Sequence, residues 1–80
     1  MRLKQIGSNM TRITLADGTE LLYSYETPVA GWDAQGAFKT TEKFSVTTTK
    51  HIKKYLESAY DRCREESQAF IEGIAVHRRA

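Results

Sequence analysis

The chain has 80 residues and a formal net charge of +2, from 12 lysines and arginines against 10 aspartates and glutamates. A chain of this length forms one domain, here 1–80, and buries only about 60% of its unfolded surface, so a partner or self-association would add stability. The charge excess is too small to indicate nucleic-acid binding by itself.

A single cysteine, Cys63, excludes an internal disulfide and a multi-cysteine zinc site. A small domain without disulfides is typical of a reducing compartment. No apolar run follows the first charged residues, and no stretch of about 18 apolar residues occurs. These features predict a cytoplasmic protein that does not cross a membrane.

Residues 1–47 carry the period of two that is typical of β-strands. Leu3–Ile6 is a candidate short strand, and the run 12–15 alternates Arg and Thr with Ile and Leu. The Asp-Gly dipeptide at 17–18 is the strongest short signal for a hairpin. The return strand is therefore expected at Thr19–Tyr25.

Beyond the hairpin, Pro28 is expected to end or bend the strand because proline cannot donate to a β-ladder. Ala30–Gly36 indicates a loop around Trp32, and Ala37–Val46 a further strand. From Thr48 onward the period changes to 3.6, with apolar side chains at spacings of three, four and seven: Ile52, Leu56, Ala59, Cys63, Phe70 and Ile74. Either Thr47 or Thr48 is the expected N-cap.

The sequence thus predicts an α+β fold. A three- to four-stranded antiparallel sheet is expected from the β-rich residues 1–47, with a long C-terminal amphipathic helix at 48–76 packed on one face. The expected core comprises Ile13, Leu15, Leu21, Tyr23, Phe44, Val46, Ile52, Leu56 and Ala59.

The expected helix is too long for the expected sheet. About 27 helical residues extend about 40 Å, whereas strands of five to seven residues extend about 17–24 Å. Phe70, Ile71 and Ile74 then need other cover. A homodimer with these residues at its interface is predicted; the alternative is a chain reversal near Glu65–Ser67 that gives a monomer with two helices.

The start of the helix carries the most suggestive polar cluster. Lysines, a histidine and threonine hydroxyls meet free backbone N–H groups there, an arrangement that favours an anion or phosphate. The predicted binding residues are Thr48, Lys50, His51, Lys53 and Lys54, extended by Lys39 and Lys43. The alternative is a solvated basic face, because lysines on a first turn cost only about 0.3–1 kcal/mol.

Trp32, followed by Phe38 and Lys39, could form an aromatic and cationic platform for a base or a protein partner. The alternative is a lid over a small core. The two histidines are far apart in sequence, the acids form no catalytic pair, and the glycines form no phosphate loop. No enzyme, metal or cofactor is therefore predicted.

Two runs resemble a family of short uncharacterised proteins from phages and integrated elements. They read Ser-Tyr-Glu-Thr-Pro-Val-Ala at 24–30 and Ser-Val-Thr-Thr-Thr-Lys-His-Ile at 45–52, and the Asp-Gly-Thr at 17–19 belongs to the same pattern. The resemblance covers about half of the chain. It implies a phage or mobile-element accessory protein in a bacterial cytoplasm.

Two functions follow as expectations. The first is an accessory protein that binds and modulates a host protein or complex, such as an anti-CRISPR-like inhibitor of a defence complex. The second is a nucleic-acid-binding module that contacts phosphates through its lysines.

Overall fold

The computed structural model describes residues 2–7 and 9–77, with residues 76 and 77 described by their backbone alone. It contains six strands and two α-helices. In chain order these are β1 (Arg2–Gly7), β2 (Met10–Thr14), β3 (Glu20–Ser24), β4 (Thr27–Asp33), β5 (Gly36–Thr40), α1 (Val46–Leu56), β6 (Arg64–Glu66) and α2 (Gln68–His77), with a 3₁₀ turn at Glu57–Ala59.

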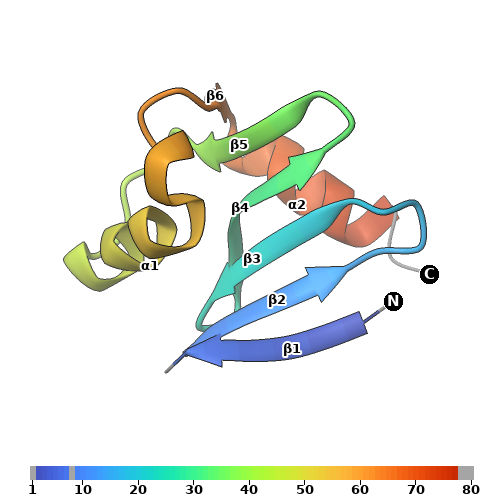
Figure 1. Cartoon of the computed structure of the whole chain (residues 1–80), viewed down its shortest axis with the longest axis horizontal. Coiled ribbons are helices and arrows are strands. Elements are labelled where there is room, and N and C mark those ends of the chain that lie inside the picture. The colour runs from blue at the N-terminus through green and yellow to red at the C-terminus, as the bar shows by residue number, and fades with distance from the viewer. Residues whose placement is uncertain (1, 8, 78–80) are drawn as a thin grey trace.

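The strands form one mixed sheet in the order β1-β2-β3-β4-β5-β6. Neighbours along β1 to β5 are antiparallel, and β6 pairs parallel to β5. A parallel pair needs a crossover connection, which α1 and the 3₁₀ turn supply here. Figure 1 shows α1 and α2 on opposite sides of the sheet, and no helix lies over β1.

Each face of the sheet has its own apolar core because side chains alternate along a strand. On the α1 face, Ile52 and Leu56 pack against Leu22 of β3 and its neighbours. On the α2 face, Ile71 and Ile74 pack with Leu21, Phe38 and other residues. Two adjacent leucines of one strand therefore belong to two different cores.

The predicted β2–β3 hairpin is confirmed. Leu15 N–H donates to the Thr19 carbonyl at 2.8 Å, and the Asp17 carboxylate accepts from Thr19 N–H at 3.0 Å. Gly18 takes a φ of +90°, a conformation that glycine adopts without steric cost. The local Asp-Gly signal thus set this turn correctly.

The predicted fold class is wrong in two respects: the sheet has six strands, and no long C-terminal helix forms. α1 ends where Glu57 takes a φ of +52°, and β6 lies inside the segment 48–76 that was expected to be helical. Ser67 then begins α2, since its hydroxyl accepts from Phe70 N–H at 3.1 Å. The alternative of a chain reversal near Glu65–Ser67 is closer to the structure.

The loop predicted at Ala30–Gly36 is also wrong, because residues up to Asp33 belong to the central strand β4. Its small residues are a packing requirement. A Cβ on Gly31 would lie 2.2 Å from the Glu20 carbonyl oxygen and 2.7 Å from Phe38 Cζ. Pro28 lies beside an irregularity in the β3–β4 register, the kind of position where a sheet accepts proline.

The predicted one-sided core is divided between two faces. Leu15 and Leu21 lie on the α2 face, whereas Ile52 and Leu56 lie on the α1 face. Phe44 and Val46 are exposed, Val46 at 73%, because β5 ends at Thr40 and the period of two does not continue. Three further expected residues, Ile13, Tyr23 and Ala59, are partly buried against the cores. No described helix is long and apolar enough to cross a membrane.

Candidate functional site

At the start of α1, some of the groups of the predicted anion site make contacts within the chain. Ser45, not Thr47 or Thr48, is the N-cap, and its hydroxyl accepts from Thr48 N–H at 3.2 Å. The Thr48 side chain is buried and its hydroxyl lies 3.1 Å from Ser24 Oγ. This threonine attaches the helix to β3 and is not displayed to a ligand.

His51 has a similar structural role. Its Nδ1 lies 2.7 Å from Ser24 Oγ, and its ring lies against the ring of Tyr25 at 5.9 Å between centroids. Ser24 is buried, and its hydroxyl contacts both His51 and Thr48. These three side chains therefore hold α1 against β3.

Only some of the predicted lysines lie close together, and Lys39 and Lys53 meet at the ring of Tyr60. Lys39 donates to the Tyr60 carbonyl at 2.9 Å and lies 3.7 Å above the Tyr60 ring, and Lys53 lies 5.5 Å from the same ring. Lys50 and Lys54 are exposed, one turn apart and away from the buried side of α1. Lys43 lines a hollow of about 460 Å³ together with Lys39 and others.

The residues of the predicted dimer interface are divided between core and surface. Ile71 and Ile74 are buried in the chain's own α2-face core, and only Phe70 is exposed, at 40%. The chain's own sheet covers Ile71 and Ile74 because α2 packs back across it, as the alternative of a chain reversal predicts.

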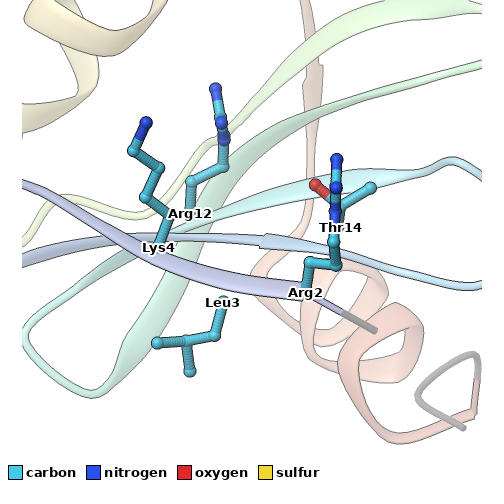
Figure 2. Close-up of a pocket in the computed structure, with 5 residues that line it drawn as sticks. All are labelled: Arg2, Leu3, Lys4, Arg12 and Thr14. Atoms are coloured by element: carbon cyan, nitrogen blue, oxygen red, sulfur yellow. The ribbon is translucent and has the colours of Figure 1, made fainter.

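A different basic cluster occupies the open end of the α1 face. The sheet register places Arg2 opposite Thr14 and Lys4 opposite Arg12, on β1 and β2. Figure 2 shows these four side chains rising from the same side of the two strands, while Leu3 points the other way. They line a hollow of about 330 Å³ with Leu3, and we call Arg2, Lys4, Arg12 and Thr14 the cationic shelf.

The charge arrangement of the cationic shelf is unfavourable for folding. Lys4 and Arg12 face each other directly, and like charges at opposed positions destabilise a sheet. Within the described ranges, the salt bridges are those of Arg64 with Asp33 at 2.6 Å and with Glu66 at 2.7 Å. No described carboxylate forms a salt bridge with the shelf.

The shelf continues across the sheet toward two further side chains. Thr14 lies opposite Glu20, and Glu20 opposite Trp32. Opposed residues share a face, so Trp32 lies on the face of the shelf and is 40% exposed. The structure thus places Trp32 at the surface of the sheet, not as a lid over a core.

Sequence reasoning missed the shelf, although a signal for it was present. Arg2 and Lys4 have the spacing of one strand face, and Arg12 and Thr14 have the same spacing on the next strand. The missing information was the pairing register, which decides that the two faces coincide. Among the described residues, no group of three His, Cys, Asp or Glu side chains could hold a metal.

Comparison with known proteins adds a family but no activity. A model of a family of unknown function, DUF8033, matches residues 1–73. No curated protein and no solved structure gave a significant match. The match covers nearly the whole chain, including the cationic shelf and the α1-face core, and it ends within α2, before Ile74 and Ala75 of the α2-face core. The chain belongs to the family of unknown function DUF8033.

Proposed function

We propose that the protein is a small binding module that holds a nucleic acid on the open half of its sheet. The observation that supports this proposal is the cationic shelf: three cations at the open end of the α1 face, two of them directly opposed, with no described carboxylate in a salt bridge with them. A like-charge pair that costs folding free energy is explained if its partner is a polyanion.

Local geometry supports this reading better than net charge does. The chain carries an excess of only two positive charges, so its affinity for phosphate depends on where the cations lie. On the shelf they follow two adjacent strands, and an exposed tryptophan lies two strands further on. Basic grooves with aromatic side chains are the usual means of binding single strands.

The test is the binding of a labelled single-stranded oligonucleotide, measured by fluorescence anisotropy at two salt concentrations. Three phosphate contacts predict that affinity falls roughly 15- to 20-fold between about 50 and about 200 mM salt, from a log–log slope of about −2. Lys4→Glu is expected to weaken binding about five- to tenfold at the lower salt, because it removes one phosphate contact and adds a repulsive charge.

Lys50→Glu is the matched control, since it makes the same change in charge on the outer side of α1. It is expected to leave affinity within about twofold at 0.15 M salt, where charges further apart than about 8 Å are screened. Equal losses in both variants, or a larger loss in Lys50→Glu, would contradict the shelf as the binding site. A larger loss in Lys50→Glu would support the lysines at the start of α1 as the binding site.

A second candidate is the protein-binding accessory role that the resemblance to phage proteins implies, with a host complex as the partner. The free edge of β1 and the 69% exposed side chain of Leu3 favour it. An extended segment of a partner can add to an open strand edge through backbone hydrogen bonds. Salt-tolerant capture of a host protein by the wild type, lost in Leu3→Glu, would support this role.

A further inference from the structure

Glu20 lies between the cations of the shelf and Trp32, a position where a negative charge is unexpected on a surface that binds phosphate. A carboxylate repels phosphates, yet this one stands in the same cross-strand row as Arg2, Thr14 and Trp32. A surface selected only for phosphate would gain affinity from a neutral or basic residue there.

Glu20 is held in place by helix α1. The Tyr55 hydroxyl donates to Glu20 Oε1 at 3.0 Å. Burial of the phenol, reinforced by the nearby charge of Glu20, raises the pKa of Tyr55 above its ordinary value. The phenol therefore keeps its proton and remains a donor at neutral pH. No described group donates to the other oxygen, Oε2, in the hydrogen bonds of the structure.

The pair of Glu20 and Trp32 has the chemistry of a base subsite. Opposed residues have Cβ atoms about 4.5–5.5 Å apart, so a base stacked on the exposed indole would lie beside the carboxylate. An oriented carboxylate accepts hydrogen bonds and repels carbonyl oxygens. Guanine offers it two adjacent donors, N1–H and the N2 amine, whereas thymine and uracil offer one N–H between two carbonyls.

We infer that Trp32 and Glu20 form a subsite for an unpaired guanine, next to the phosphate-binding shelf. The inference deepens the proposed function and rests on it. The shelf cations contact the backbone of a single strand, Trp32 stacks one base, and Glu20, oriented by Tyr55, selects that base by its donor edge. Duplex nucleic acid is excluded from this subsite because its donor edges are already paired.

The experiment compares labelled oligothymidylates of about ten residues that carry guanine, inosine, cytosine or thymine at the centre. Inosine keeps N1–H but lacks the N2 amine. The wild type is expected to bind the guanine oligomer about tenfold tighter than the all-thymine oligomer, with inosine between them, since a good bidentate pair gives discrimination of this order.

Glu20→Gln is expected to abolish the guanine preference while the all-thymine oligomer binds as well or better. Tyr55→Phe, which frees the carboxylate without removing it, is expected to reduce the preference. Glu26→Gln is the matched control, because it removes one charge from an exposed residue between β3 and β4. Thermal melts monitored by circular dichroism establish that each variant is folded.

Three results would overturn the inference. Equal wild-type binding of the guanine and thymine oligomers would overturn it while leaving the phosphate-binding shelf intact. A guanine preference that survives in Glu20→Gln would also overturn it. Failure of every oligomer to bind would overturn the proposed function and this subsite together.

Discussion

At the scale of single residues, Gly31 is required by close packing. It lies in the central strand β4, where β3 and Phe38 of β5 approach its Cα. A methyl group at this position meets backbone on one side and an aromatic ring on the other, and neither can move without disturbing the sheet. Gly73 in α2 is the opposite case, since nothing lies within 4 Å of the Cβ it would carry.

The contrast between these two glycines predicts effects of opposite sign. Gly31→Ala is expected to lower the free energy of unfolding by about 1–3 kcal/mol or more, through overpacking. Gly73→Ala is expected to raise it by about 0.5–1 kcal/mol, because alanine is the better helix former. Urea denaturation measures both. An unchanged midpoint in Gly31→Ala would show that the sheet relaxes around the methyl group.

The Tyr55 phenol is a second residue whose environment has a measurable consequence. Its folded-state pKa is raised, first by burial and then by the charge of Glu20, while the unfolded value is about 10. The stabilisation linked to this group is therefore complete below pH 10. It is lost as the pH rises above 10, because the unfolded chain then ionises the phenol more readily than the folded one.

The prediction compares wild type with Tyr55→Phe by urea denaturation at neutral and alkaline pH. At pH 7 the variant is expected to be less stable by about 1.5–3 kcal/mol, the contribution of a hydrogen bond to a charged group. Above pH 10 the difference should shrink. Tyr25→Phe, which alters an exposed phenol, is the control. A difference that stays constant to pH 11 would contradict a raised pKa.

At the scale of elements, β1 and β2 are the pair in which the proposed binding surface opposes folding stability. Lys4 and Arg12 repel each other across the pair, and β1 is the edge strand with no helix over it. Charged side chains on an edge strand also discourage pairing with other chains.

The Lys4→Glu variant should therefore gain stability while it loses binding. A cross-strand pair of unlike charges contributes roughly 0.2–1 kcal/mol to the stability of a sheet. The substitution also removes the repulsion between Lys4 and Arg12. The expected increase in the free energy of unfolding is about 0.5–1 kcal/mol at low salt, and it should decrease at high salt through screening. Destabilisation by this change would show that Lys4 has a structural role that the sheet register does not reveal.

At the scale of the whole molecule, the presence of a core on each face of the sheet weakens the argument for a homodimer. Both helices pack against the sheet. Most of the apolar residues that suggested a homodimer are therefore buried within one chain. Of the predicted interface only Phe70 remains exposed, and its ring meets Phe38 edge-on at 6.3 Å between centroids. The homodimer stays a prediction, with a smaller surface to support it.

Sedimentation equilibrium of the wild type at high micromolar concentration tests the homodimer, and a monomer there would contradict it. Phe70→Glu is the suitable variant and should dissociate a dimer without unfolding the chain. Ile74→Glu is unsuitable because it would place a charge in the α2-face core and unfold the monomer. Loss of the folded state in Phe70→Glu would show that this ring belongs to the core and not to an interface.

The sequence by itself determined the features that depend on neighbours along the chain. The Asp-Gly turn, the alternation within β2 and β3, and a helix that includes the apolar positions Ile52 and Leu56 are all local, and the structure contains each of them, although α1 begins at Val46 and not at Thr48. For residues 48–76 the sequence left two alternatives, one long helix or a chain reversal near Glu65–Ser67. The chain reversal is closer to the structure, which has two helices there.

Tertiary structure decided what depends on partners distant in sequence. β6 is a strand only because β5 offers it an edge, and three residues with two glutamates carry no strand signal of their own. Ala30 and Gly31 are buried in β4 between β3 and β5, where the close approach of the neighbouring strands favours small residues. The cationic shelf exists only because the register sets Lys4 against Arg12 and Thr14 against Glu20. A shift of one residue would send those side chains to the other face, which is why pairing and not composition placed the candidate site.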